Sequence, residues 1–492
     1  MCMFLFDNIL NFLILSPLIG VFCLLLIDFR ENRLLKLTAL NNSFICFVGF
    51  LFVWACFDKS ESNFQFYNKF VLVPFLNLNL ALGIDGISLF FVILNCLLIP
   101  VCLLASWNSI NFNVKEFSII FLVLNFLLIN VFCCLDLLFF YVFFESILIP
   151  MFIIIGVWGS RQRKTLAAYY FFLYTLVGSI VMLFGVIYLI SQIGTTDYEI
   201  LLISCFCDFE QKLLWFSFFL SFASKIPMVP FHLWLPEAHV EAPTPGSVLL
   251  AGILLKLGSY GFIRFSLPFF PKASFFFSPL VYTIIILSVI YGSLTAIRQT
   301  DFKRIVAYTS IAHMNVVVLG IFSFNVVGIE GAIFQSLSHG FVASSLFLII
   351  GIVYDRYKSR LIKYYGGLAS TMPMYVTIFL FFSVANIGFP GTSSFIGEFL
   401  IFLGAFKVST EISFLAATSM VLGGAYSLWL FNRVAYGNLK TQYTKKFLDL
   451  SFRELLIFTP LIIGTFCSGV YPTMFLNVMH SSVFYLVELL YY

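Results

Sequence analysis

The sequence predicts an all-α polytopic membrane protein with about fourteen transmembrane helices. Of its 492 residues, 61% are hydrophobic and only 10% are charged, and the mean hydropathy is +1.04. Soluble domains carry roughly 25% charged residues. Long apolar runs and an uneven distribution of Lys and Arg between alternate connections predict the same class. The net charge of +4 is too small to indicate a nucleic-acid partner.

The apolar runs predict the positions of the helices. A transmembrane helix needs ~20 mostly apolar residues. On this rule the predicted spans are 9–27, 36–56, 87–106, 117–134, 136–156, 166–191, 213–232, 246–265, 277–297, 304–322, 330–353, 374–404, 412–434 and 453–472. The run 374–404 is too long for one straight helix and contains Gly and Pro around Pro390, which predicts a broken helix. The tail 473–492 is aromatic and amphipathic and is predicted to lie along the membrane interface.

The basic residues predict the orientation. The odd-numbered connections carry nineteen of the 27 Lys and Arg residues, the even-numbered connections carry five, and the other three lie within spans. By the positive-inside rule, the odd-numbered connections face the cytoplasm or the matrix, and both termini are predicted on the opposite side. An incorrect number of spans would mix the two groups, so this asymmetry supports fourteen.

Lys225 lies in an apolar run and is followed by Pro227 and Pro230. Proline removes a backbone donor and clashes with the preceding turn, so the helix is predicted to break beside the charge. Non-helical backbone at membrane depth is tolerated only inside protein or beside a water-filled cavity. A lysine next to such a break therefore predicts an ion site. The alternative is a lysine whose ammonium group extends to the interface.

The two predicted breaks, in spans seven and twelve, are five spans apart. This spacing predicts two inverted five-helix repeats, spans 4–8 and spans 9–13. The corresponding division of the chain is helices 1–3 (1–110), the first repeat (111–270), the second repeat (271–436), and helix 14 with the tail (437–492).

Six titratable residues at predicted membrane depth form the candidate site. Taken alone, a histidine in an apolar helix is more often a hydrogen-bonded packing residue. The simplest ion-pair partner for Lys225 is Glu145. The complete set lies on six different spans, as a proton path across or along the membrane requires. Its members are Glu145, Lys225, Lys256, His313, His339 and Glu398.

Other features predict no cofactor or metal in this chain. The segment HLWLPEAHVEAPTPG has two His and two Glu, but their spacing matches no metal-ligand pattern, and five prolines between 227 and 245 favour a rigid turn. We expect this turn to shape the access to Lys225. The eleven cysteines show no ligand spacing either. The basic stretch GSRQRK (159–164) is predicted to anchor the chain at the interface.

Several of these segments are also similar to a known family. LGIDGISLFF (82–91), FYVFFESILIPMFIIIGVWGSRQRK (140–164), SKIPMVPFHLWLPEAHVEAPTPGSVLLAGILLKLGSYG (224–261), QTDFKRIVAYTSIAHMN (299–315), SLSHGFVASSLFLIIGIVYDR (336–356) and NIGFPGTSSFIGEF (386–399) closely resemble the antiporter-like membrane subunits of NADH:ubiquinone oxidoreductase (respiratory complex I). The resemblance covers nearly all of the chain after residue 80.

The resemblance implies fourteen helices, inverted repeats, and proton pumping as part of an NADH:ubiquinone reductase. It implies that Glu145 and Lys225 interact in a first half-channel and that Lys256 connects onward through the two histidines to Glu398 in a second. NADH, FMN, iron–sulfur clusters and ubiquinone would bind to partner subunits. The implied neighbours are the two other antiporter-like chains, 2 and 5, and lipids such as cardiolipin.

The implied location is the mitochondrial inner membrane, with the termini on the intermembrane-space side. The excess of Phe (65 residues) suggests an AT-rich organellar genome, and the N-terminus lacks a basic presequence. Two other functions stay open. One is a subunit of a stand-alone multi-subunit cation/proton antiporter, since fold alone does not decide function. The other is a structural scaffold of the membrane arm, in which the charges only hold helices together.

Overall fold

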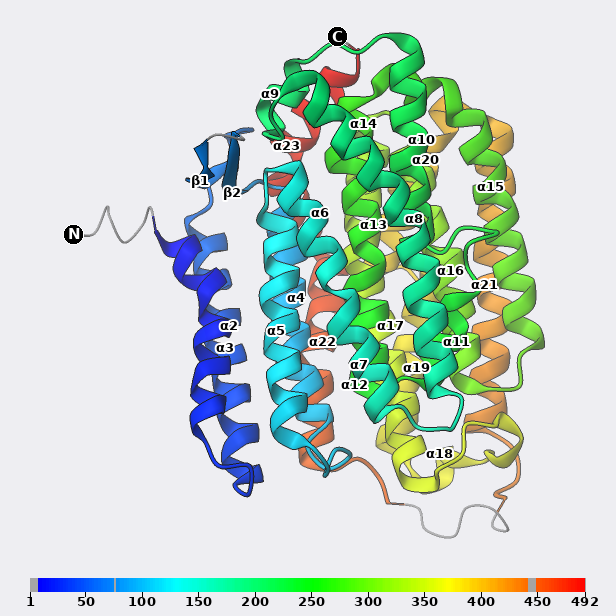
Figure 1. The fold of residues 1–492 in the computed structure, drawn as a ribbon. Coiled ribbons are helices and arrows are strands. Elements are labelled where there is room, and N and C mark those ends of the chain that lie inside the picture. The colour runs from blue at the N-terminus through cyan, green and yellow to red at the C-terminus, as the bar shows by residue number, and fades with distance from the viewer. Residues whose placement is uncertain (1–7, 75–76, 441–447, 492) are drawn as a thin grey trace.

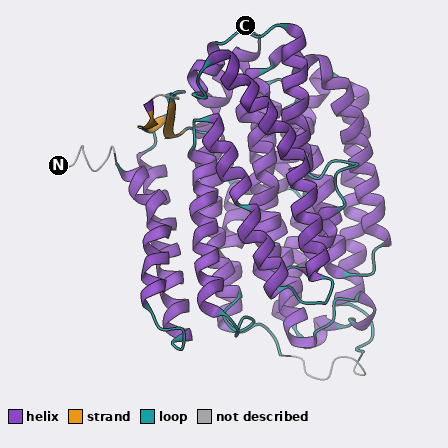
Figure 2. Ribbon diagram, viewed as in Figure 1, coloured by secondary structure: helices purple, strands orange, loops and turns teal. Residues whose placement is uncertain are grey.

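The computed structural model describes residues 8–74, 77–440 and 448–491, which form a bundle of long helices with a two-stranded hairpin at one end (Figures 1 and 2). The helices of the first half are α2 (Ile9–Leu26), α3 (Asn32–Cys56), α4 (Ser88–Ala105), α5 (Val114–Cys133), α6 (Leu137–Ser146), α7 (Leu148–Trp158), α8 (Lys164–Ile193), α9 (Tyr198–Ile203), α10 (Asp208–Lys225), α11 (Trp234–Glu241), α12 (Thr244–Leu249), α13 (Leu255–Gly261) and α14 (Leu267–Phe269). The second half contains α15 (Pro271–Arg298), α16 (Phe302–Ile321), α17 (Val326–Tyr357), α18 (Leu368–Thr371), α19 (Pro373–Ile387), α20 (Ser393–Val408), α21 (Thr410–Ala435), α22 (Phe452–Val470) and α23 (Thr473–Tyr491).

Thirteen helical segments of the described residues are long and apolar enough to cross a membrane, so the chain is a multi-pass membrane protein. They cover twelve of the predicted spans. The other two predicted spans, 213–232 and 374–404, are interrupted: α10 ends at Lys225, and five residues separate α19 from α20. The pairing of the two halves as inverted repeats stays a prediction.

The second interruption depends on glycine. Gly388 ends α19 with φ +83°, and Gly391 has φ +95°. Residues with a Cβ atom rarely adopt this left-handed conformation, whereas glycine adopts it at little cost. The break therefore follows directly from the residues that predicted it.

The prediction of a rigid turn over 233–245 is wrong, because this segment is mostly helical. This segment folds into helix α11 and the beginning of α12, and α11 is almost entirely buried. Pro236 lies in the first turn of α11 and Pro245 in the first turn of α12. The backbone N–H groups of a first helical turn have no partner within the helix, so proline is tolerated there.

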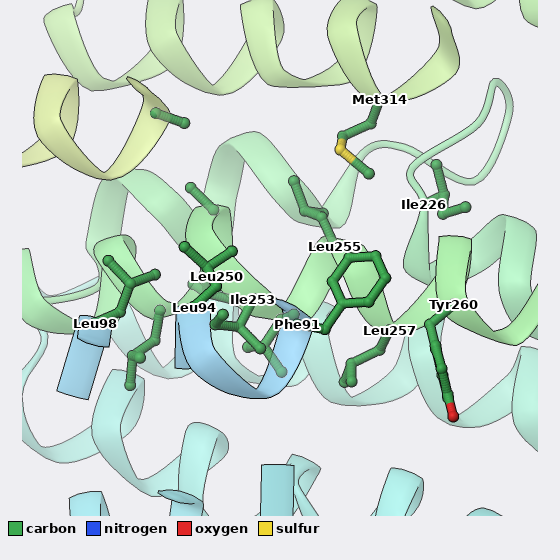
Figure 3. Packing of buried hydrophobic residues seen from close by; sticks show 14 of the residues in the cluster. Phe91, Leu94, Leu98, Ile226, Leu250, Ile253, Leu255, Leu257, Tyr260 and Met314 are labelled. Atoms are coloured by element: carbon green, nitrogen blue, oxygen red, sulfur yellow. The ribbon is translucent and has the colours of Figure 1, made fainter. Parts of the chain in front are cut away.

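The core of the bundle is the continuous helical segment 244–269, which contains α12, α13, α14 and two π-helical stretches, η2 (Leu250–Leu254) and η3 (Phe262–Ser266). Every residue of this segment is buried inside the protein. Figure 3 shows several of its side chains, including Leu250, Ile253 and Leu257, in one cluster with Phe91 of α4 and Met314 of α16. Lys256 is therefore carried by the most enclosed helix of the molecule.

Two elements cover one end of the bundle. The hairpin strands β1 (Gln65–Val73) and β2 (Leu78–Ile84) pair antiparallel, with Asn68 opposite Leu82. The chain is otherwise mostly helical, as predicted, and this short hairpin lies in the connection 57–86 between two predicted spans. The backbone of β2 continues this pairing to Leu135, whose N–H donates to the Ala81 carbonyl.

Helix α23 is hydrogen-bonded to several connections at this same end. The Ser481 hydroxyl donates to the carbonyls of Lys59 and Glu61, the Ser482 hydroxyl accepts from the Gly86 N–H, and the Tyr491 hydroxyl donates to the Phe324 carbonyl. These contacts lie along the second half of α23, from Ser481 to Tyr491. The helix is long and apolar enough to cross a membrane, so its position along the interface stays a prediction.

Candidate functional site

Glu145, near the end of α6, and Lys225, the last residue of α10, form the first buried pair. Lys225 Nζ lies 3.9 Å from Glu145 Oε1, and the side chains are 3% and 14% exposed. This separation is too long for a hydrogen bond, and neither charged group has a hydrogen-bond partner among the described residues. The ammonium group also lies 4.2 Å from the centre of the Phe144 ring. In surroundings of low polarity, a small change in this distance changes the interaction energy strongly.

Lys256 of α13 and His339 of α17 form the second pair. Lys256 Nζ lies 2.7 Å from His339 Nδ1, and both side chains are buried. Lys256 also donates to the carbonyl of Ala251 in the π-helical stretch η2, and such widened turns are frequent at functional sites. An ammonium group has no acceptor, so a protonated Lys256 donates to Nδ1 and leaves the His339 proton on Nε2. This nitrogen has no protein partner among the described residues.

The third pair is His313 of α16 with Glu398 of α20. His313 Nδ1 lies 3.0 Å from Glu398 Oε1, and Gln335 Nε2 donates to the same oxygen at 3.1 Å. The Tyr426 hydroxyl lies 3.4 Å from His313 Nε2. The rings of His313 and His339 are 6.0 Å apart between centres, a distance that one bridging water can span. The second and third pairs therefore form one row through four helices.

The first pair is separate from this row: no hydrogen bond of the described residues joins Lys225 to Lys256. The two backbones nevertheless touch. A Cβ atom on Gly258 would lie 2.5 Å from Ile226 Cγ1 and 3.0 Å from the Phe222 carbonyl oxygen, so glycine allows the end of α10 to pack closely on α13. Proton transfer between the two lysines requires bridging water or a movement of this contact.

Sequence reasoning missed several polar residues near these pairs. Gln335 lies four residues before His339 on α17, a spacing that places both on one helix face and could have identified it. Arg264 and Asp85 form a buried ion pair at 2.6 Å, but their positions, 179 residues apart, give no local signal. The charge count assigns Lys303 to a basic connection, whereas its side chain is buried.

The His/Glu segment 232–241 has no metal-binding geometry. Glu237 Oε1 instead accepts from Arg304 Nη2 at 2.6 Å, and the His239 ring stacks on Phe347 with centres 4.5 Å apart. Within 8–74, 77–440 and 448–491, no group of three His, Cys, Asp or Glu side chains could hold a metal ion.

Comparison with known proteins matches this architecture to a family. Residues 134–423 match the family model "NADH:quinone oxidoreductase/Mrp antiporter, TM". The chain is 57% identical over 479 residues to NADH–ubiquinone oxidoreductase chain 4 of Arabidopsis thaliana and 56% identical over 483 residues to that of Marchantia polymorpha. The alignments cover 97% and 98% of both chains, respectively. The chain belongs to the family of NADH–ubiquinone oxidoreductase chain 4.

Solved structures agree with this family. The chain is similar to a chain of respiratory complex I from Thermus thermophilus, with a TM-score of 0.89, 29% identity, and coverage of 98% of this chain and 99% of that one. A chain of an archaeal membrane-bound sulfane sulfur reductase shares the fold, with a TM-score of 0.85 at 21% identity, covering 96% of this chain and 77% of that one. As a chain 4 family member, the protein is an antiporter-like subunit of NADH–ubiquinone oxidoreductase.

Proposed function

We propose that this subunit translocates protons across the mitochondrial inner membrane, driven by NADH-to-ubiquinone electron transfer in other subunits. The observation that carries the proposal is the buried row Lys256–His339–His313–Glu398, which joins four helices at membrane depth. Each member can bind and release a proton. NADH, FMN, iron–sulfur clusters and ubiquinone belong to the partner subunits. The neighbours would be chains 2 and 5, with cardiolipin among the surrounding lipids.

The Glu145–Lys225 pair is the proposed control point. A carboxylate at 3.9 Å stabilises the ammonium form of Lys225. When that carboxylate is neutralised or moves away, Lys225 becomes a stronger acid and releases its proton towards Lys256. The conformational or electrostatic signal would come from the redox subunits. Uptake from the side of the basic connections and release on the other side complete the cycle, with both termini on the intermembrane-space side.

The test is Glu145→Gln in membranes that contain the complete complex. We expect the complex to assemble, while proton translocation and coupled NADH oxidation fall by about tenfold or more, because Lys225 loses the charge that sets its proton affinity. The measurements are proton translocation per NADH and complex abundance on a native gel. Asp208→Asn is the matched control, because Asp208 is 74% exposed and pairs with Lys272 on the surface. Normal translocation by assembled Glu145→Gln complex would favour a structural role for the buried charges.

Gly388→Ala tests the Glu398 end of the row. A Cβ atom at Gly388 would lie 2.9 Å from Glu398 Oε2, and the left-handed backbone adds strain. We expect assembled complex with coupled activity lowered by up to about 10²-fold, because the carboxylate is displaced. Gly391→Ala is the control: its backbone is similarly strained, but its Cβ would have no atom within 4 Å. The difference between the two variants therefore measures the effect of displacing the Glu398 carboxylate. Equal activities of the two variants would contradict the assignment of Glu398.

A stand-alone cation/proton antiporter is the second candidate, because the matching family model also covers Mrp antiporters. The two functions differ in the complex into which this chain assembles. Comigration of this chain with NADH dehydrogenase activity on a native gel is the result expected for the oxidoreductase. Its absence from that band would favour the antiporter.

A further inference from the structure

Lys303, the second residue of α16, is a buried cation that the row of proton carriers does not use. Its side chain is 1% exposed. Lys303 Nζ donates to the Ala242 carbonyl at 2.8 Å and to the Ser247 hydroxyl at 3.0 Å. Ala242 ends α11 and Ser247 lies in α12, so the ammonium group bridges the break between these helices. Neither hydrogen-bond partner is a carboxylate, and a buried ammonium without one is a costly arrangement.

His239 is the second unexplained group at this break. It is fully buried in α11, and neither ring nitrogen has a hydrogen-bond partner among the described residues. Its carbonyl accepts from the Ser247 hydroxyl, the same group that accepts from Lys303. The ring lies close enough to both Lys303 and Lys256 to interact with their charges. A buried imidazole with no protein partner among the described residues requires a water partner or a proton-transfer role.

A cavity of about 460 Å³ lies beside the α11–α12 break and the start of α16. It is lined by residues of four segments, including Arg161, Glu241, Asp301 and Arg304. Glu241 is only 2% exposed, and its Oε2 has no protein partner among the described residues. Glu241, Asp301 and Asp355 all interact electrostatically with Lys303. The cavity is large enough for several waters and has carboxylates that attract protons.

We propose that Lys303 and His239 form a loading branch that delivers protons from the cavity on the basic-connection side to the Lys256–His339 pair. This branch rests on the proposed proton translocation and adds a route that does not pass through Lys225. Its position explains why two titratable groups are buried at the α11–α12 break: Lys303, which donates only to uncharged groups, and His239, whose ring has no hydrogen-bond partner among the described residues.

The steps balance as simple proton transfers. A proton from cavity water binds the free amine of Lys303. The resulting ammonium releases one proton, through the Ser247 hydroxyl or a water, to a nitrogen of His239. The imidazolium of His239 then protonates the free base of the Lys256–His339 pair. Each step breaks one bond to hydrogen and forms another, and no oxidant or reductant takes part.

Lys303→Arg and His239→Gln test the branch in the intact complex. Arginine keeps the positive charge and the donors to the Ala242 carbonyl, but it retains its proton at every accessible pH. Glutamine keeps hydrogen bonding without proton exchange. We expect both variants to assemble on a native gel and to lose about tenfold or more of coupled proton translocation. Lys272→Arg, a surface lysine with a 74% exposed side chain, is the control.

The outcomes separate this branch from the proposed function. If Lys303→Arg or His239→Gln assembles and pumps at the normal rate, the branch is wrong, and Lys303 is a structural clamp on the end of α11. If Glu145→Gln stops pumping in the same experiment, the proposed function still stands. If Glu145→Gln and both branch variants all pump normally, the proposed function fails together with the branch.

Discussion

Lys256→Met is expected to leave the complex assembled and to lower proton translocation and coupled NADH oxidation by about tenfold or more. Methionine is unbranched and similar in length, so it fills the space that the lysine occupies on the central helix. Replacing a buried charge by an apolar side chain of similar volume is often neutral for stability. The proton carrier between the two halves is lost, and a positioned acid–base group contributes about 10²–10⁴-fold.

Lys256→Arg provides the sharper comparison. It keeps a positive charge near His339 Nδ1, 2.7 Å away in the wild type, but it does not release its proton. Loss of translocation in both variants, with normal abundance on a native gel, would assign the defect to proton exchange. Normal pumping by assembled Lys256→Met complex would remove Lys256 from the path. Lys272→Met serves as the surface control.

Arg264→Met is expected to prevent stable assembly. Arg264 Nη2 lies 2.6 Å from Asp85 Oδ1, and each side chain is only 4% exposed. The guanidinium group also donates to the Tyr260 hydroxyl and packs against the rings of Phe64 and Tyr198. Removing one partner of a buried ion pair costs about 3–5 kcal/mol, because the other charge stays buried and unpaired. The abundance of the complex on a native gel and its thermal inactivation measure this loss.

The double variant Asp85→Leu/Arg264→Met provides the control for this prediction. It removes both charges, so no unpaired charge remains, and we expect more assembled complex than in either single variant. Asp85 also accepts from the Ser88 N–H at the start of α4, so recovery will be partial. Equal losses in the two single variants and the double variant would show that packing, rather than the ion pair, holds these segments together.

Local composition was sufficient to predict the positions of most of the helices. Long apolar runs predicted twelve of the thirteen helical segments able to cross a membrane, and Pro and Gly marked both interruptions. These signals are strong because the bilayer requires ~20 apolar residues per span and satisfied backbone groups. Segment 233–245 was predicted incorrectly because Pro236 and Pro245 fall in first helical turns, where they do not break a helix, and Pro243 lies between the two helices.

The pairing within the candidate site was only partly accessible from sequence. Glu145 was assigned to Lys225 because each is a charge in an apolar run, and the structure places them 3.9 Å apart. The 2.7 Å contact of Lys256 with His339 depends on how α13 packs on α17. No local pattern encodes that contact, because the two residues are 83 positions apart.

The sequence by itself predicted the membrane class and most spans, and it nominated two helix breaks and six titratable residues, because each depends on the chemistry of a short stretch in a bilayer. Tertiary structure decided the contacts that no local pattern predicts, such as Lys256 with His339, and it decided that Lys303, Arg264 and Asp85 are buried as well. Burial and pairing depend on neighbours contributed by distant helices. The physical reason is that a charge in a lipid-embedded bundle is stabilised by whichever partner packing brings within reach.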